Sequence, residues 1–411
     1  MTFDLRKAPF LYLLTMPITS DERGRLGGVI FAHADAFLHP LEEPQFIWCR
    51  LPERILPDPG YLFVQGINPA LLRRGLNERD FIQKIQNLIK DRTVITWDAK
   101  RLSTLSKCAK RSFKNGLNNF FLLDVLGLTD LCSALHAAHL LGSLSQAPHK
   151  ALDMTAQLYN CQKQNKRSPQ RRLCELQDIT LMLRSSHQAL FDYQLRSTEF
   201  KNSLLNKALN EQSLLSCITA DGMIYLTKII SQDPLNHKYL CLQIGRKKQR
   251  KAKYINALDG NVIAPAGVLT KERCDRLQLD FVALKNALDI SCSAKQIEAS
   301  QISEQTDYFD PTNEYDLKFL KIADETPNVP EPFKECSVKL MEHYFFYLGD
   351  NERGKLSYGQ YKKYETISKK QVEKQLPKYM QKTQALINHA DEDSQDDALL
   401  INAIANYPLT I

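Results

Sequence analysis

FLYLLTMP, from Phe10 to Pro17, is a short apolar run that ends at a proline, and three similar runs follow it within the first hundred residues. These are GVIFAHA (residues 28–34), QFIWCRL (45–51) and RTVITW (92–97). β-Branched and aromatic residues cluster in these runs between glycine, proline and polar breakers, which is the pattern of β-strands. The first hundred residues are therefore predicted to form a sheet that begins at FLYLLTMP.

A helical pattern interrupts the series of strands. ERDFIQKIQNLIK (residues 78–90) places Phe81, Ile82, Ile85 and Ile89 at helical intervals, and a predicted strand follows directly. LPDPGYLF (56–63) is predicted to be a proline- and glycine-containing turn between strands. Strands, a helix and a further strand in this order indicate an α/β domain.

The rest of the chain changes character twice. The pattern is helical from 120 to 196, where LCELQDITLMLRSSHQALFDY (173–193) is a long amphipathic segment. Between about 212 and 263, MIYLTKII and KYLCLQI are short β-like runs that indicate a small β-rich domain. A polar segment (293–316) leads to a final part that is predicted to be helical.

The composition is that of an ordinary soluble protein. A chain of 411 residues favours two or three domains, and 43% hydrophobic with 25% charged residues can bury several cores. The ten cysteines are scattered without a CxxC pair, which predicts reduced thiols and no zinc site. With no signal peptide and no apolar run of about 18 residues or more, we expect a cytoplasmic protein without a membrane partner.

The wording of several segments resembles bacterial exonuclease I, a single-strand-specific 3′→5′ DNA exonuclease of the RNase-H-like superfamily. The resemblance runs thinly over nearly the whole chain, and it rests on the shared order and spacing of segments rather than on any single one. The segments are FLYL (10–13), ILPDPGYLFVQGINP (55–69), LLDV (122–125), LFDY (190–193), LTKERCDRLQL (269–279), DYFDPTNEYDLKFLKIADETPNVP (307–330), KLMEHYFFYL (339–348) and ALLINAIANYP (398–408).

The resemblance implies an α/β + β + α multidomain fold. It predicts an RNase-H-like exonuclease-type domain (1–198), an SH3-like β-rich domain (199–300) and a helical C-terminal domain (301–411). Together these would form a C-shaped groove for single-stranded DNA, and we expect a monomer.

The residues that carry catalysis in the family are missing here. Its two divalent metals need carboxylate oxygens and a general-base histidine. The D-x-E pair of the first strand falls on Leu14 and Met16, and the third acid falls on Ser103 or Thr104. The H-x-x-x-x-D motif, counted back from LFDY, falls on Arg167 and Arg172. We therefore expect a pseudonuclease without metal or other cofactor, which binds single-stranded DNA, a replication or repair partner, or both.

Two alternatives stay open. Asp98 and Asp124 lie nearby, and a working magnesium-dependent exonuclease could use such displaced ligands, although helix capping or bonds to backbone amides explain both aspartates more simply. His149 and Asp153 in HKALD resemble the lost motif but lie about 18 residues too early, counted on the same motif spacing. The other alternative is a protein-interaction module that has lost DNA binding as well.

Three basic runs carry the prediction of DNA binding. Single-strand binders combine a positive groove with aromatic side chains, although a solvated basic surface can have the same composition. The predicted DNA-binding residues are Trp97, Lys100, Arg101, Lys107, Lys110 and Arg111 in the first run, Lys166, Arg167, Arg171 and Arg172 in the second, and Lys247, Lys248 and Arg250 in the third.

The resemblance also implies a protein partner. The family binds the acidic, phenylalanine-ended C-terminal tail of single-strand DNA-binding protein in a basic pocket beside a tyrosine. Tyr193 matches that tyrosine, and Lys271 lies next to the position of one pocket arginine, which is Thr270 here. The alternative is that Tyr193 is an ordinary core residue.

Overall fold

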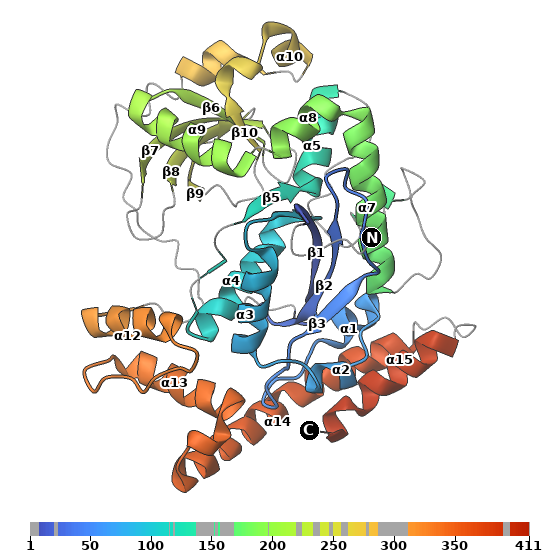
Figure 1. The fold of residues 1–411 in the computed structure, drawn as a ribbon, viewed down its shortest axis with the longest axis vertical. Helices are drawn as coiled ribbons and strands as arrows, with labels where there is room; N and C mark the ends of the chain where they lie inside the picture. Colours follow the sequence, from blue (N-terminus) through green and yellow to red (C-terminus); the bar gives the residue numbers. More distant parts are fainter. Residues whose placement is uncertain are drawn as a thin grey trace.

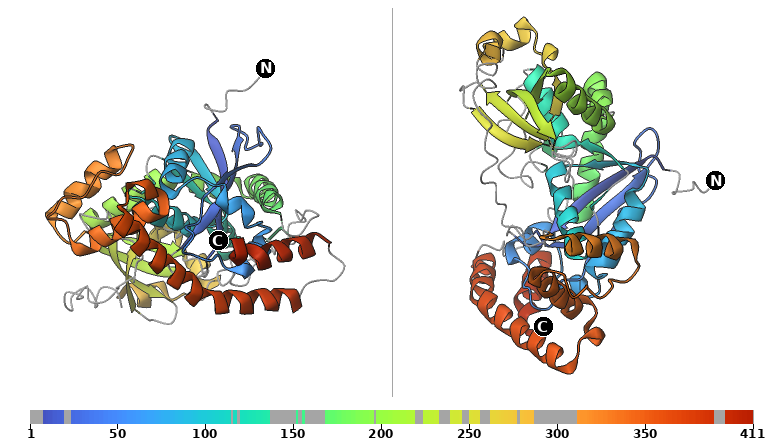
Figure 2. Two further views of the ribbon diagram at one scale, coloured as in Figure 1. Left: turned by 90° about the horizontal axis from the view of Figure 1, so that it is seen from below. Right: turned by 90° about the vertical axis from the view of Figure 1, so that its left-hand side faces the viewer.

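The computed structural model of the protein contains an α/β part, a β-rich part and a helical part, with the α/β part in the middle (Figures 1 and 2). Residues 8–19, 24–114, 116–117, 120–136, 152, 155–156, 168–195, 197–218, 224–232, 239–245, 250–255, 262–276, 279–286, 311–388 and 395–410 are described. The β-rich part and the helical part lie at opposite ends of the α/β part (Figure 2).

The first sheet contains the four strands predicted from the sequence and a fifth at Phe121–Asp124, so the prediction that the helical region begins at 120 is wrong for these residues. These are β1 (Phe10–Pro17), β2 (Leu26–Ala34), β3 (Gln45–Trp48), β4 (Thr93–Thr96) and β5 (Phe121–Asp124), in the order β3-β2-β1-β4-β5. β1 pairs with β2 antiparallel and with β4 parallel, and β4 pairs with β5 parallel. FLYLLTMP is thus the central strand of the sheet.

Alternating residues of β1 enter two different cores. Leu11 and Leu13 pack with α3 (Glu78–Ile89) and α4 (Leu102–Arg111) on one face. Tyr12 and Leu14 pack on the other face with residues of α5 (Val125–His136), α7 (Pro169–Ser186) and α8 (Gln188–Leu195). Because side chains alternate along a strand, residues 12, 14 and 16 share the α7 face.

One predicted turn is wrong. LPDPGYLF does not join two strands but begins α1 (Pro59–Gln65), which precedes the short α2 (Ala70–Arg73). The Asp58 side chain accepts a hydrogen bond from the Gly60 amide at 2.9 Å, and proline at the first helical position suits a helix start. The long helical segment from 173 is interrupted at His187, where α7 ends and α8 begins.

The second sheet is antiparallel throughout. Its strands are β6 (Leu214–Ile218), β7 (Ile224–Gln232), β8 (Tyr239–Gly245), β9 (Arg250–Ile255) and β10 (Val262–Pro265), in the order β10-β6-β7-β8-β9. The predicted runs MIYLTKII and KYLCLQI form β7 and β8. α9 (Ser197–Glu211) packs on this sheet, and α10 (Lys271–Arg276) follows it.

The C-terminal part is helical, as predicted. It contains α12 (Glu314–Glu325), α13 (Val338–Asn351), α14 (Tyr358–Asn388) and α15 (Gln395–Asn406). α14 and α15 pack against α1, and Tyr379 and Ile404 share one core cluster with Met16 of β1. The C-terminal helices and the first sheet therefore have a hydrophobic core in common. The domain boundaries at 198/199 and 300/301 stay a prediction.

The cysteines and the longest helices test two predictions made from the composition. The eight cysteines in the described ranges are free, and all of them except Cys174 are buried. Among the described helices, none is both long and apolar enough to cross a membrane.

A buried ion cluster joins β2, α3 and α4. The Glu78 carboxylate accepts a hydrogen bond from Arg111 Nη2 at 2.8 Å and one from Arg25 Nη1 at 3.0 Å. All three residues are at most 8% exposed. Burial alone would raise the pKa of Glu78, but Arg111 and Arg25 outweigh it and lower this pKa to about 2.

The neighbouring Arg79 joins this region to the C-terminal helices. Its guanidinium donates to the carbonyls of Ser112 at 2.7 Å and of Ala323 and Thr326 at 2.6 Å each. His343 of α13 bonds the carbonyl of Arg111 at 3.0 Å. Glu78 and Arg79, consecutive residues of α3, thus bind two different helices. Glu78 binds Arg111 of α4, and Arg79 binds carbonyls at the C-terminal end of α12.

We predict that Glu78→Gln lowers the free energy of unfolding by about 3–5 kcal/mol, because it leaves two buried guanidinium groups without their shared carboxylate. Chemical denaturation at pH 7 measures the change. Glu365→Gln is the matched control, since Glu365 pairs with Lys362 on the surface and surface pairs contribute little.

The pH dependence of the free energy of unfolding gives a second test of the role of Glu78. The folded pKa of Glu78 is lowered from 4.5 to about 2, so its stabilisation is complete above pH 4.5 and is lost as the pH falls through 2. The difference between wild type and Glu78→Gln should therefore narrow over this range. A difference that is small at pH 7 would show that the cluster does not stabilise the fold.

Candidate functional site

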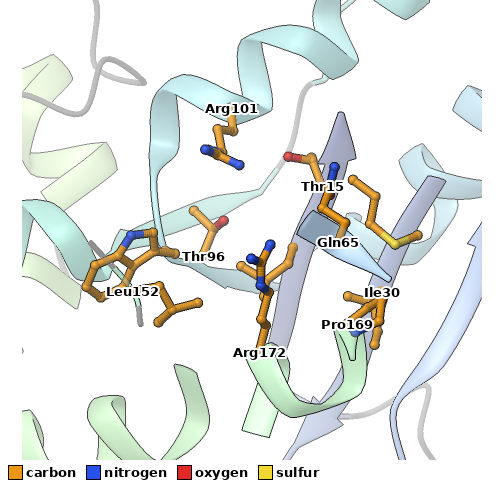
Figure 3. Close-up of a pocket in the computed structure, with 11 residues that line it drawn as sticks. Thr15, Ile30, Gln65, Thr96, Arg101, Leu152, Pro169 and Arg172 are labelled. Carbon is orange, nitrogen blue, oxygen red and sulfur yellow. The ribbon is translucent and has the colours of Figure 1, made fainter. Parts of the chain in front are cut away.

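A small hollow lies where β1 and β4 end, beside the first turn of α7 (Figure 3). Its cavity volume is about 30 Å³, and all of the empty space up to its opening into solvent amounts to about 500 Å³. Side chains from six different elements surround it, and two of these side chains are arginines. The lining residues are Leu14, Thr15, Met16, Ile30, Gln65, Thr96, Trp97, Arg101, Leu152, Pro169 and Arg172.

The β1 wall of the hollow is apolar. Leu14 is half-buried and Met16 is 2% exposed, and they pair across the sheet with Ile30 and Gly28 of β2. These are the two positions where the sequence predicts the family's first carboxylates to be replaced. Neither side chain has an oxygen, so neither can coordinate a hard cation such as magnesium.

Two guanidinium groups enter the hollow from opposite sides (Figure 3). Arg172 comes from the first turn of α7, is 9% exposed and donates to the Val64 carbonyl at 3.3 Å. Arg101 comes from the 3-10 turn η2 (Ala99–Arg101) and lies 3.8 Å from the Asp98 carboxylate. The pKa of Arg101 is lowered by burial and by the charge of Arg172, although Asp98 opposes the shift. The two positive charges therefore act on each other.

The two nearby aspartates have structural partners. The Asp124 carboxylate accepts a hydrogen bond from the Gly127 amide at 3.1 Å, so it caps α5 as the simpler interpretation predicts. Asp98 is 5% exposed and lies beside Arg101. Within the described ranges, no group of three or more histidine, cysteine, aspartate or glutamate residues is arranged to hold a metal ion. Among the residues described at this hollow, the oxygen donors do not fit two magnesium ions.

Of the other motif positions predicted from the sequence, those that the structure describes lie outside the hollow. Ser103 is exposed and Thr104 is half-buried on α4, and neither lines the hollow. Arg167 and Lys166 lie outside the described residues, as do His149 and Asp153. Arg172, at the second of the predicted H-x-x-x-x-D positions, lines the hollow.

Several members of the basic runs lie inside the protein rather than on its surface. Arg111 is held by Glu78, and Arg171 donates to the buried Glu175 at 2.6 Å. Trp97 is 2% exposed and belongs to the core under the sheet, where it also forms part of the hollow. A buried arginine bound to a carboxylate contributes no phosphate contact at the surface, so Arg111 and Arg171 leave the set of candidate DNA ligands.

Other members are at the surface or are not described. Lys110 is exposed and Lys107 is half-buried, both on α4. Lys247 and Lys248 lie outside the described residues, and the side chains of Lys100 and Arg250 are also outside the description, although both residues belong to regular elements.

Sequence reasoning missed part of the site and one basic surface. Gln65 and Thr96 are buried and line the hollow, and the only sign of them in the sequence is that they lie within ILPDPGYLFVQGINP and RTVITW. The long helix α14 presents a further group of exposed lysines, which interleaved acids conceal in the sequence. These are Lys362, Lys363, Lys369, Lys370, Lys374 and Lys378.

The two residues named for the predicted peptide pocket have different surroundings. Tyr193 is half-buried, packs with Leu269 and Cys274, and donates its hydroxyl to the Ile263 carbonyl. Burial raises the pKa of Tyr193 to about 12. Lys271 is exposed at the start of α10. Tyr193 thus has the contacts of a packing residue, and an exposed lysine begins the helix next to its cluster.

Comparison with solved structures identifies the fold. No family model matches the sequence, and no curated protein does. A zinc-bound structure of E. coli exonuclease I with single-stranded DNA is 16% identical, covers 98% of this chain and 99% of its own, and gives a TM-score of 0.72. Apo exonuclease I is 17% identical over 98% of both chains, with a TM-score of 0.75. A complex of exonuclease I with SSB-Ct is 15% identical over 97% of this chain and 98% of its own, with a TM-score of 0.72.

These values confirm the predicted fold class. The chain combines a mixed sheet with its helices, a second sheet and a helical C-terminal part, and the match extends over the full length of exonuclease I. The chain therefore has the fold of exonuclease I, and its hollow at the end of β1 is lined by leucine, methionine and two arginines among other residues.

Proposed function

We propose that this protein binds single-stranded DNA on an exonuclease I scaffold and does not hydrolyse it. The proposal rests on the side chains at the C-terminal end of β1 and in the first turn of α7. Leu14 and Met16 stand where carboxylates are expected, and Arg101 and Arg172 point into the same hollow.

The chemistry of the hollow supports binding over cleavage. Two-metal hydrolysis needs several oxygen ligands that hold ions about 3.5–4 Å apart. Leucine and methionine supply none, and Asp124 caps a helix. Arginine, in contrast, can bind a phosphate directly as a planar bidentate donor without a bridging cation.

Basic surface beyond the hollow gives the strand further phosphate contacts. Lys107 and Lys110 follow Arg101 along α4 toward solvent. In the absence of base-specific contacts, such lysines bind the backbone of any sequence. We propose that the strand follows this basic surface and meets the hollow at one point.

The rival function is a metal-dependent exonuclease with displaced ligands. It would have to use Asp98, which lies beside Arg101 in the same region. A positive neighbour at 3.8 Å opposes the approach of a divalent cation to this carboxylate. This electrostatic conflict is why we place the rival second.

The first test is enzymatic. Purified full-length protein should release no mononucleotides from 3′-labelled single-stranded DNA with magnesium or manganese, because the ligand set for two ions is incomplete. Metal-dependent release that disappears in Asp98→Ala would establish the rival function. A crystal soaked in manganese checks the same point, and two ions bridged by Asp98 or Asp124 would have the same meaning.

The second test concerns the mode of binding. Affinity for single-stranded DNA should persist in EDTA and fall with salt, with a slope of about −0.7 per neutralised phosphate. Arg167→Ala with Arg172→Ala should weaken binding to all sequences alike and reduce the slope by roughly one or two. Glutamate at both positions should weaken it further. Arg74→Ala is the control, since Arg74 is exposed and does not line the hollow. Normal binding by the double alanine variant would exclude these arginines from the DNA site.

A proposed second partner is the C-terminal tail of single-strand DNA-binding protein. The complex of exonuclease I with SSB-Ct and the position of Lys271 next to the Tyr193 cluster support it. A peptide with the acidic, phenylalanine-ended tail should bind with a Kd on the order of micromolar. Lys271→Glu should weaken it without changing the fold, because this side chain is exposed.

Tyr193→Ala tests the pocket itself. Tyr193→Phe is its matched control, because it keeps the ring and removes only the hydroxyl, which donates a hydrogen bond to the Ile263 carbonyl. Peptide binding that Tyr193→Ala leaves unchanged would place the peptide elsewhere. A peptide that does not bind the wild-type protein would exclude this partner.

A further inference from the structure

The shape of the hollow suits a chemical group that enters it, rather than a chain that passes across it. Leu14 and Met16 from β1 and Ile30 from β2 form one wall. Gln65 at the end of α1 and the residues of η2 and α7 form the other sides. An internal phosphodiester has a sugar on each side, whereas the end of a strand can place its last group in a recess.

The two guanidinium groups make this recess selective for negatively charged groups. Arg101 and Arg172 approach it from opposite sides (Figure 3), and the Asp98 carboxylate lies 3.8 Å from Arg101. A guanidinium carries five N–H donors in a fixed fork, so it can engage a phosphate in addition to its contacts within the protein. Two such groups, pointing at one space, match a ligand with several acceptor oxygens and more than one negative charge.

A terminal phosphate monoester is such a ligand. It carries about −1.5 to −2 charges at pH 7 and has three strong acceptor oxygens. An internal phosphodiester carries a single charge and has two non-bridging oxygens. The apolar walls increase the difference in binding energy between the monoester and the diester, because interactions between charges gain strength away from water. Ile30, Leu152 and Met16 in these walls are each at most 3% exposed.

We propose that the hollow binds the terminal phosphate monoester of a single strand, held between Arg101 and Arg172. The inference rests on the proposed function, since it takes for granted that the strand binds this scaffold. It adds to that function a preference for phosphorylated ends over hydroxyl ends. The shared chemistry is the monoester, and the experiment decides which end of the strand supplies it.

The experiment compares three oligothymidylates with an internal fluorophore: one with a 3′-phosphate, one with a 5′-phosphate, and one with hydroxyl groups at both ends. Fluorescence anisotropy with the full-length protein in EDTA gives the three dissociation constants. We expect one phosphorylated end to bind about tenfold more tightly than the hydroxyl strand, because it adds one or more charge-assisted hydrogen bonds. Inorganic phosphate should compete selectively with that strand.

The variants locate the effect. Arg101→Gln and Arg172→Gln, singly and together, should remove the preference, so that phosphorylated and hydroxyl strands bind with equal affinity. That common affinity should itself be lower than the wild-type affinity for the hydroxyl strand, because Arg172 also belongs to the proposed DNA site. Arg74→Gln removes the same charge from an exposed arginine outside the hollow, and should keep the preference. Because Arg172 is buried, thermal denaturation of each variant establishes that it is folded. Arg101 is 21% exposed in its side chain, so the Arg101 variant gives a second and milder test.

The outcomes separate the inference from the function on which it rests. Equal affinity for all three strands would overturn the terminal-phosphate site and leave DNA binding intact. A preference that persists in the double glutamine variant would also overturn it. A protein that binds none of the strands would contradict the proposed function as well.

Discussion

The position of the site depends on a buried carboxylate that it does not contain. Glu78 binds both Arg25, which leads into β2, and Arg111, which ends α4. This contact fixes one end of α4 against the sheet, and the other end of the same helix follows directly from η2, which carries Arg101. Removing charge from such a cluster leaves the partner charges buried, which is far more costly than breaking a surface pair. The direction of α4, and with it the place of Arg101, therefore follows from an ion cluster in the interior.

The apolar residues of the hollow follow from the sheet in the same way. Met16 and Leu14 lie on the α7 face of the central strand, where a carboxylate must have a cation or hydrogen-bond donors to offset the loss of water. Without bound metal, two acids there would repel each other and remain poorly solvated. Leucine and methionine remove this cost and extend the hydrophobic core, so the strand keeps its packing while its side chains lose the capacity to bind a hard ion.

Much of the fold could be predicted from the sequence, whereas the roles of single charged residues could not. The strands at FLYLLTMP, GVIFAHA, QFIWCRL and RTVITW were recognisable because their β-branched and aromatic residues stand between breakers. The segment at Asp58 was misleading because proline and glycine mark helix starts as well as turns. A run of basic residues gives no indication of which members face inward, although Glu175, four residues after Arg171, was a visible sign of a helical pair. Arg101 and Arg172 lie on opposite sides of one hollow only because the folded chain brings η2 close to α7, which the sequence does not indicate.

Building a metal site at this end of β1 would require more than placing two acids on the strand. Met16 is 2% exposed and belongs to the core cluster that contains Tyr379 and Ile404 of the C-terminal helices. A carboxylate at this position would place a charge in the packing between the sheet and α14. It would also meet Arg172 and Arg101, which would pair with the acid and compete with a divalent cation for it. The apolar side chain at Met16 is thus coupled to the packing of the C-terminal helices on one side and to the two arginines on the other, and a change at any one of the three positions acts on the other two.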